Sequence, residues 1–555
     1  MATVQANQEA GVRLHVKALV AMTFVSLSSF QYGLDFGVIG GLQAMIGFLK
    51  VRSSLLYPIF LLGRVHLLTV GASGFRRTPS EALPKWNISS ERQQLISSLM
   101  VLGAFISSSS AGFTSRWIGR RLSLWIACAL VFVSTAIMQA TVDIGGLYAG
   151  RLILGLANGL LMTHAQLYIT EVVPARFRGL GISAFTLWIA LGSFVGNLID
   201  YGTAERPDRS SYIIPLGTVH IIPGILFIVL FFLPESPRWL AARGQTRQAE
   251  KSLTWLRPGP AHWSVSDEIA EMEAALAAEA QLQSSIGFMD LFRNPIDRRR
   301  TTIAVLGLTT QAASGAMFLI SYGTYFFSMA DVGDAFTNSC ILTGVGVAAL
   351  VISNLVITRW GYRRPMMMAG FALCGLAQLI IAIVYTVEPG TQKTGKVIVG
   401  VSVIYIVAYN CLIAPYAWLS GGELASQRLR SYTFGIATAI GFLGAWLTTF
   451  TAPYFINPDS LNWGPKYGYI WAPSCFIAMV WIYFYLPEAK DRTLEQIDEM
   501  FEARLPARKF RGYQCTGSHA ALEKEKEAHM AHVTHEEGDG ASSTTKQHVV
   551  ADTKV

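Results

Sequence analysis

The sequence predicts an all-α membrane protein, with twelve transmembrane helices arranged in two pseudo-symmetric six-helix halves. Three observations support this fold class: long apolar segments, few charged residues, and motifs that occur twice. The chain of 555 residues is 52% hydrophobic and 14% charged, whereas a soluble domain carries about a quarter charged residues. Its mean hydropathy is positive.

The repeated motifs combine acids and arginines, and the second copies follow the first at a near-constant distance. They are Glu171…Arg178 with Glu423…Arg430, Arg116–Arg121 with Arg359–Arg364, and Pro234-Glu235 with Pro487-Glu488. Such internal repetition is typical of secondary transporters, which are often built from two homologous halves.

The apolar runs are long enough to cross roughly 30 Å of hydrocarbon as helices. In the first half, 17–233, they lie near 17–40, 93–113, 122–141, 146–168, 180–200 and 213–233. In the second half, 301–486, they lie near 301–327, 338–358, 365–386, 397–420, 431–452 and 468–486.

The charges of the short connections predict the orientation of the spans. Arginines gather after even-numbered spans, where the positive-inside rule places the cytoplasm. They are Arg116, Arg120, Arg121, Arg176, Arg178, Arg359, Arg363, Arg364, Arg428 and Arg430. The opposite connections carry Asp143, Asp200, Asp331 and Asp334. We therefore expect both termini in the cytoplasm, and residues 1–16 show no cleavable signal peptide.

The remaining segments are polar, with one exception. Residues 234–300 are expected to form a cytoplasmic helical linker between the halves, and the tail 487–555 is expected to be cytoplasmic and disordered after about residue 513. Residues 51–92 are expected to form an exterior loop, with a glycosylation sequon at Asn87. Within it, 51–75 is apolar and basic, and a span there would reverse every later connection. It is either a poorly ordered loop or retained intron sequence, and we favour the second.

The sequence excludes several classes of protein. Six cysteines at unrelated spacings form neither a disulfide framework nor a metal motif. Despite a net charge of +8, the arginines punctuate apolar runs and form no basic face for nucleic acid. The sequence contains no nucleophile–base set and no phosphate loop, so we expect neither an enzyme nor a cofactor.

Five motifs carry a resemblance to a known family. They are Tyr32-Gly-Leu-Asp35-Phe-Gly37, Gly150-Arg151-Leu-Ile-Leu-Gly155, Glu171…Arg178-Gly179, Pro234-Glu235-Ser-Pro-Arg238 and Pro487-Glu488…Arg492-Thr493. In this order, over residues 30–510, they resemble the sugar porter family of the major facilitator superfamily in its fungal form. The stretches 322–327, 426–430 and 505–510 are most similar to the α-glucoside (maltose-type) permeases. The resemblance implies a monomeric plasma-membrane importer of a sugar or sugar-like solute, driven by the proton gradient through alternating access.

Asp35 is the only acid inside the first span, and an intramembrane carboxylate is a functional candidate that needs a partner. Arg151 in the fourth span is the expected partner. In the family's proton symporters these two positions form the coupling pair, and the resemblance implies the same role here. Separating a buried carboxylate from a guanidinium changes its proton affinity. The alternatives are a static ion pair and uniport with an inherited aspartate.

The resemblance also implies a cytoplasmic charge network that holds the halves together in the outward-open state. Its expected members are Glu171, Arg178, Arg116, Arg120, Arg121, Glu235, Arg238, Arg359, Arg363, Glu423, Arg430 and Glu488. The acid that the family places early in each basic turn is missing, because Arg116 and Thr358 stand there. We expect such a network to hold the outward-open state less firmly.

The family's sugar site combines hydrogen-bonding side chains with aromatic faces from spans 5, 7 and 10. The expected substrate-binding residues are Gln311, Trp418, Thr186, Tyr322, Tyr325 and Trp188. Several hexose-reading amides are replaced, at Thr186, Ala312 and Met317. This favours a larger or less polar solute: a disaccharide, a polyol, a cyclitol, or a sugar-decorated or aromatic metabolite.

Other interpretations stay open. His164 is either a proton relay or a histidine hydrogen-bonded within the bundle. A non-transporting nutrient sensor is disfavoured because such relatives carry longer tails. An exporter of a fungal metabolite is compatible with the altered site, although the Asp35 and Arg151 pair favours import.

Overall fold

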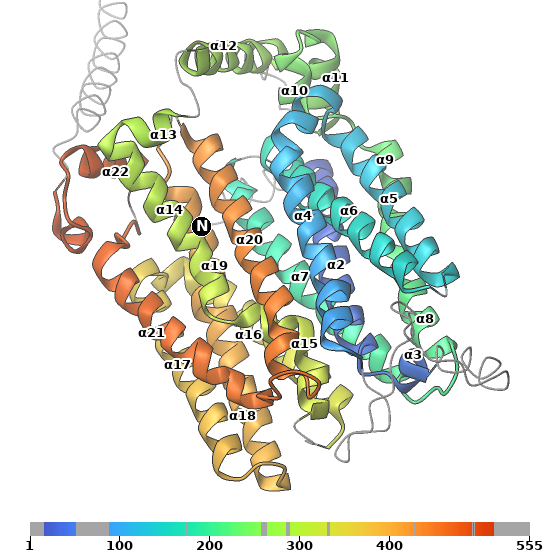
Figure 1. The fold of residues 1–555 in the computed structure, drawn as a ribbon. Coiled ribbons are helices and arrows are strands. Elements are labelled where there is room, and N and C mark those ends of the chain that lie inside the picture. The colour runs from blue at the N-terminus through green and yellow to red at the C-terminus, as the bar shows by residue number, and fades with distance from the viewer. Residues whose placement is uncertain are drawn as a thin grey trace, which may run out of the picture. The chain divides into compact units, whose positions relative to one another are not determined.

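The computed structural model describes residues 16–50, 88–141, 143–173, 175–256, 264–284, 289–329, 333–426, 429–490, 492 and 494–514. Within these ranges all regular structure is helical (Figure 1), which confirms the predicted all-α class. The stretch 51–75, the sequon at Asn87, Arg428 and the tail beyond 514 lie outside the described residues.

The helices of the first half follow the predicted spans closely. They are α2 (Val16–Leu42), α4 (Ser90–Ile118), α5 (Arg120–Ala140), α6 (Ile144–Val172), α7 (Ala175–Thr203), α8 (Ser210–Thr218) and α9 (Ile221–Phe232). The short α3 (Ile46–Lys50) follows α2, and α8 with α9 together form one span, Ser210–Phe232.

The second half repeats this pattern, but two of its spans are interrupted. Its helices are α14 (Pro295–Ala313), α15 (Ala316–Met329), α16 (Ala335–Trp360), α17 (Arg363–Val387), α18 (Gln392–Ala408), the π-helical turn η2 (Tyr409–Ile413), α19 (Ala414–Glu423), α20 (Arg430–Ile456), the 3₁₀ turn η4 (Gly464–Tyr467) and α21 (Gly468–Tyr485). The first interrupted span joins α14 to α15, and the second joins α18 through η2 to α19.

Eleven helical segments of the described residues are long and apolar enough to cross a membrane. The remaining predicted span is α2, which is 27 residues long but less apolar, since it carries serines, Gln31 and Asp35. Most side chains of α2 are buried against other helices. A helix inside a bundle can hold polar groups that would be costly against lipid.

Glycines bring α2 and α7 into close contact. A Cβ atom on Gly33 would lie 1.9 Å from the carbonyl oxygen of Ile189, and one on Gly192 would lie 2.1 Å from that of Phe30. Contacts between small residues let transmembrane helices pack backbone to backbone. This packing fixes the rotation of α2 and therefore the direction of Asp35.

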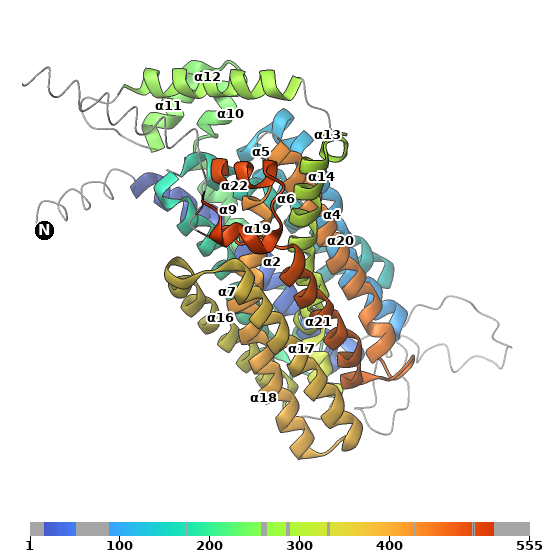
Figure 2. The same cartoon turned by 90° about the vertical axis from the view of Figure 1, so that its left-hand side faces the viewer.

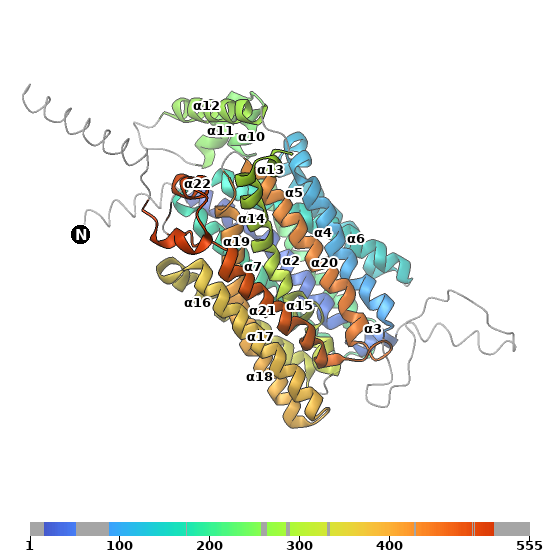
Figure 3. The same cartoon turned by 60° about the vertical axis from the view of Figure 1, so that its left-hand side comes forward.

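The segment between the halves forms α10 (Pro237–Ala242), α11 (Thr246–Leu256), α12 (Val265–Ser284) and α13 (Asp290–Arg293). Figures 2 and 3 show α10, α11 and α12 gathered at one end of the bundle. They are tied to the first half, because Arg243 Nη2 donates to the carbonyl of Trp117 at 2.6 Å and Tyr168 donates to that of Pro234 at 2.9 Å. A separate unit begins at Pro487 and contains α22 (Leu494–Glu502) and the 3₁₀ turn η5 (Ala507–Gly512).

The two halves meet at the opposite end of the bundle, where α4 begins and α20 ends. Asn457 Nδ2 donates to the carbonyl of Ile88 at 2.8 Å and to Gln93 Oε1 at 3.1 Å. The hydroxyls of Ser90 and Ser460 lie 2.7 Å apart. These hydrogen bonds hold the halves together on that side.

Candidate transport site

The two residues expected to form the coupling pair contact each other inside the first half. Arg151 Nη1 donates to Asp35 Oδ1 at 2.7 Å, and Arg151 Nε donates to the carbonyl of Ile96 at 2.9 Å. Asn158 Nδ2 lies 3.5 Å from Asp35 Oδ2. The Arg151 and Asp35 side chains are 0% and 2% exposed. An ion pair so deeply buried is tolerated only when further hydrogen bonds satisfy its polar atoms.

The hydrogen bonding around this pair is incomplete. Within the described residues, Arg151 Nη2 and Asn158 Oδ1 are buried without a partner, and so are both amide atoms of Gln31, one turn before Asp35. Buried polar atoms without partners are rare in folded proteins and call for a reason. Asp35 is therefore close to spare hydrogen-bond donors and acceptors as well as to Arg151.

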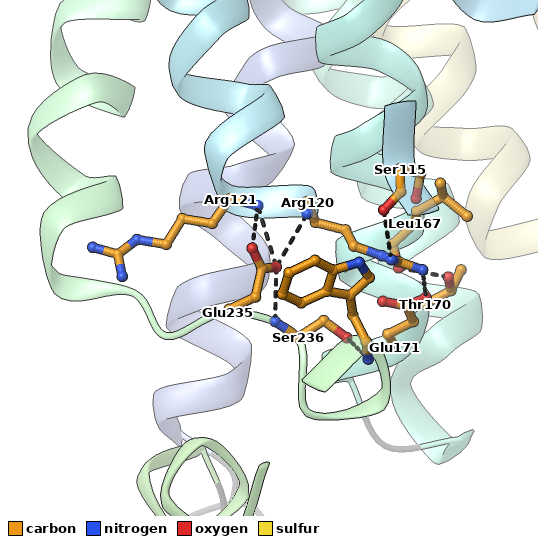
Figure 4. A network of polar contacts seen from close by, with 9 residues as sticks. Ser115, Arg120, Arg121, Leu167, Thr170, Glu171, Glu235 and Ser236 are labelled. Atoms are coloured by element: carbon orange, nitrogen blue, oxygen red, sulfur yellow. Dashed lines mark hydrogen bonds and ion pairs between the residues drawn. The ribbon is translucent and has the colours of Figure 1, made fainter. Parts of the chain in front are cut away.

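The first basic turn, Arg116–Arg121, forms a compact polar network with Glu171 and Glu235 (Figure 4). Arg120 Nη2 donates to Glu171 Oε1 at 2.6 Å. Glu235 accepts hydrogen bonds from the backbone amides of Arg120 at 3.1 Å and Ser236 at 2.9 Å, and from that of Arg121. Glu235 thus caps the N-terminus of α5, where a negative charge is favoured by the helix dipole.

Gly119 makes this cap possible. Its φ of 92° lies in the region that favours glycine, and a Cβ atom there would lie 2.7 Å from Glu235 Oε2. Burial raises the pKa of Glu235, and the backbone amides that bind its carboxylate oppose that rise. The carboxylate is therefore held by backbone groups, a role that the sequence alone did not reveal.

The second half contains the matching ion pair. Arg363 binds both carboxylate oxygens of Glu423, through Nη2 at 2.7 Å and Nε at 3.1 Å. In each half the paired arginine is followed by a second arginine, which contacts an aromatic ring. Arg121 lies 5.1 Å from the Trp125 ring centroid, and Arg364 lies 5.1 Å from that of Tyr483. The duplicated motif has folded into a duplicated set of contacts.

The other expected network residues are more dispersed. Arg116 and Arg238 are exposed. Arg178, Arg359 and Arg430 lie in described helices, but their side chains are outside the described part. Glu488 belongs to the separate unit, where it accepts from the backbone amide of Lys490 at 3.1 Å. The structure thus brings together Arg120, Arg121, Glu171 and Glu235, and separately Arg363 and Glu423.

Gln311 lies at the interruption between α14 and α15, where Gly315 has a φ of 76°. Tyr409, in the π-helical turn η2, donates to Gln311 Oε1 at 3.4 Å, and Tyr405 donates to the carbonyl of Ser314 at 2.9 Å. The two interrupted spans are thus joined by tyrosine hydroxyls. Interrupted helices frequently mark binding sites in transporters. The sequence analysis missed both tyrosines, although Pro415 just beyond them signals a break.

The other expected substrate residues lie in several environments. Trp418 packs against Val305, Leu308 and Ala437. Tyr322 is buried and donates to the carbonyl of Thr449 at 2.7 Å. Tyr325 is buried and Thr186 is half-buried. Trp188 packs edge-on against Phe30, with ring centroids 6.0 Å apart.

An apolar cluster joins the two halves. Tyr32, Phe36 and Met100 of the first half contact residues of the second half that include Met317 and Trp446. Met317 stands where the family's hexose carriers have an asparagine, so this replacement adds to an apolar surface between the halves.

His164 is hydrogen-bonded within the first half. Its Nδ1 lies 3.0 Å from the carbonyl of Leu160, and its Nε2 lies 3.3 Å from the Thr114 hydroxyl. Both ring nitrogens thus have local partners, as expected for a histidine with a packing role.

Comparisons with known proteins agree on one family. Residues 21–501 match the family model described as "Sugar (and other) transporter". The major facilitator-type transporter ecdD of Aspergillus rugulosus is 28% identical, over 96% of this chain and 96% of its own. The alpha-glucosides permease MPH3 of Saccharomyces cerevisiae is 27% identical, over 82% of this chain and 76% of its own.

A sensor and a solved transporter structure are also similar to this chain. The high glucose sensor RGT2 of Saccharomyces cerevisiae is 27% identical over 89% of this chain, but this chain covers only 62% of the sensor's length. The xylose transporter XylE of E. coli, in an inward-open conformation, superposes with a TM-score of 0.67 at 19% identity, over 87% of this chain and 99% of its own. That superposition shows a shared fold.

Proposed function

The chain belongs to the sugar transporter family of the major facilitator superfamily, and from that premise we propose that it is a proton-coupled importer of a sugar-like solute. In this proposal the two halves move against each other and expose one binding site alternately to each side of the membrane. The observation that carries the proposal is the buried ion pair of Asp35 and Arg151, 2.7 Å long.

The pair couples protonation to conformation in the following way. A proton on Asp35 removes its charge and weakens the attraction of Arg151, which keeps its hydrogen bond to Ile96. The neutral acid can then donate to the unpartnered amide oxygen of Gln31 or of Asn158. Because the two states of Asp35 favour different side-chain arrangements, binding of a proton shifts the balance between conformations.

The solute is proposed to be larger or less polar than a hexose. Gln311 and Trp418 keep one amide and one aromatic face from the family's sugar site. The apolar cluster around Met317 and Trp446 suits a ring with an extended C–H surface. The alpha-glucosides permease MPH3 supports this class, because an α-glucoside is larger than a hexose.

We also propose that the protein is a plasma-membrane monomer with both termini in the cytoplasm. The basic turns that carry Arg120 and Arg363 support this orientation through the positive-inside rule. Labelling of terminal epitope tags in intact and permeabilised cells tests it, since cytoplasmic tags are labelled only after permeabilisation.

Uptake measurements test the proposed function. Cells without their own sugar carriers receive the wild-type chain or Asp35→Asn, and labelled glucose, maltose, myo-inositol and quinate are supplied with and without a protonophore. We expect one solute to accumulate in the wild type, and both the variant and the protonophore to abolish accumulation. The matched control is Asp143→Asn, at the exposed N-cap of α6, which should accumulate normally. Equilibrating uptake that ignores both treatments would instead make the protein a uniporter.

A further inference from the structure

Asp200 is a second carboxylate inside the bundle, used by neither the coupling pair nor the charge network. The sequence analysis assigned it to a connection between spans, but it lies in α7, within the membrane span Ala184–Thr203. Its exposure is 0%. Neither of its carboxylate oxygens has a side-chain hydrogen-bond partner among the described residues, and the backbone of Gly41 lies against the carboxylate.

The backbone of α2 makes the space that Asp200 occupies. A Cβ atom on Gly41 would lie 2.1 Å from Asp200 Oδ2 and 2.8 Å from its Cγ. Any larger residue at position 41 would therefore collide with the carboxyl group. Gly41 lies on the same helix as Asp35, so α2 both carries Asp35 and contacts Asp200.

No cationic side chain among the described residues is paired with Asp200. Cys340 of α16 lies within electrostatic range of it, and Asp334 acts on the same thiol. Just before α8, Arg209 Nε donates to the Tyr212 hydroxyl at 3.1 Å, and Asp208 accepts from the Ser210 hydroxyl at 3.0 Å.

Polar side chains elsewhere on α7 and just after the end of α2 are also engaged by other groups. Gln43 Nε2 donates to the carbonyl of Ile39 at 3.1 Å and to the Ser97 hydroxyl at 2.9 Å. Asn197 Nδ2 donates to the carbonyl of Ser193 at 3.1 Å. Among the residues that the structure describes, Asp200 thus has no counter-ion and no side-chain donor.

The helix that carries Asp200 also forms part of the contact between the two halves. Asn197 Nδ2 lies 3.4 Å from the Thr343 hydroxyl of α16, and a Cβ atom on Gly344 would lie 3.0 Å from the ring of Phe194. Separation of α7 from α16 would expose the Asp200 side of α7 to water.

We propose that Asp200 is a second proton-binding site, which holds its proton while α7 packs against α16 and releases it when the two helices separate. An ionised carboxylate buried without a donor or counter-ion is strongly unfavourable, whereas a neutral acid leaves only unmet hydrogen bonds. Packing of the two helices therefore requires the proton, and water around the separated helices removes that requirement. The coupling to helix separation rests on the proposed alternation of the halves, but its tests need no transported solute.

The first test compares the thermal stability of the purified full-length wild type and Asp200→Asn between about pH 4 and pH 8. An aspartate in the unfolded chain has a pKa of about 3.9. At neutral pH the wild type must take up a proton to fold, so its stability falls as pH rises, and the asparagine variant escapes this loss. We expect the variant to have the higher Tm at pH 8, and the gap to close near pH 4.

The matched control for this test is Asp143→Asn, because asparagine caps a helix as well as aspartate does. It should show no such gap at high pH. Parallel curves for wild type and Asp200→Asn, or a variant with the lower Tm at every pH, would overturn the proton site and leave Asp200 a structural residue.

The second test uses Cys340 as a native reporter in a Cys411→Ser/Cys515→Ser background, since Cys128, Cys374 and Cys475 are buried. We measure its rate of labelling by a membrane-impermeant maleimide, with and without Asp200→Asn, at each pH. The labelling rate with Asp200, divided by the rate with Asp200→Asn, should grow several-fold from about pH 5 to pH 8. The reason is that only the aspartate can lose a proton and favour separation. A ratio that stays constant would overturn the link to helix separation, whatever the uptake assays show for Asp35.

Discussion

Arg363 and Glu423 form a two-point ion pair, with contacts of 2.7 and 3.1 Å, between the start of α17 and the end of α19. The equivalent pair in the first half, Arg120 and Glu171, joins α5 to α6 at 2.6 Å. Each pair therefore ties together helices of its own half. The charge network was expected to bridge the halves, but each of these two ion pairs lies within one half.

This arrangement predicts how removal of the acids affects stability. Glu171→Gln and Glu423→Gln should each lower the free energy of unfolding by about 1 kcal/mol, because the side chains are only partly buried and water screens the pairs. The double variant should lose about the sum, since each pair lies within its own half. Thermal unfolding of the purified protein measures both effects.

High salt provides the control for this prediction, because screening should shrink both losses. A double variant that loses far more than the sum would contradict the assignment of each pair to its own half and indicate a shared network.

A second prediction concerns the pH dependence of Glu235. Its pKa is raised by burial, so it contributes a stability that is fully present below the unfolded pKa of about 4.3 and is lost as pH rises through the folded pKa. Glu235→Gln has no such proton to lose. The Tm of the wild type relative to the variant should therefore fall as pH rises from about 4 to 7.

The control for this prediction is Glu91→Gln, in the first turn of α4, where the side chain is exposed. It should leave the pH profile of the wild type unchanged. A wild type that gains stability over Glu235→Gln as pH rises would show that the backbone amides outweigh burial.

The sequence predicted the spans well and their interruptions poorly, for a physical reason. Apolar length is a property of composition, so α4 or α16 could be located from hydropathy alone. The interruption at Gly315 depends on tertiary contacts: a Cβ there would lie 2.6 Å from the Trp471 ring, and the Ser314 carbonyl is satisfied by Tyr405. Composition does not reveal such partners.

The sequence likewise predicted some features of the candidate site and missed others. The family resemblance predicted the contact of Asp35 with Arg151 and placed Arg120 and Glu171 in one network, because its motifs correspond to positions on the helices. They did not indicate that Glu235 binds backbone amides. The charge pattern assigned Asp200 to a connection between spans, because an acid at the end of an apolar run is more often a loop residue than a buried one.

The contact between Ser90 at the start of α4 and Ser460 in the loop after α20 gives a third prediction. The hydroxyls of Ser90 and Ser460 lie 2.7 Å apart, a separation compatible with the short Cβ distances of disulfides. Ser90→Cys/Ser460→Cys should form a disulfide on mild oxidation and lose most uptake, because the halves can no longer separate there. Reduction should restore uptake.

Each single cysteine variant is the control and should transport normally under oxidation. Full uptake by the oxidised double variant, with the disulfide shown by a mobility shift, would mean that this end of the bundle does not open during transport.

The last prediction separates solute binding from the support of the interrupted spans. Tyr409→Phe removes the hydrogen bond to Gln311 Oε1, so this amide loses one fixed partner. A neutral hydrogen bond contributes about 0.5–1.5 kcal/mol, so KM for the transported solute should rise roughly two- to tenfold. The accumulation ratio should stay near that of the wild type, because Asp35 and Arg151 are untouched. The matched variant Tyr405→Phe removes the bond to the Ser314 carbonyl and should lower Tm with little change in KM. If both variants change KM equally, Gln311 has no special contact with the solute, and the interruption itself shapes the site.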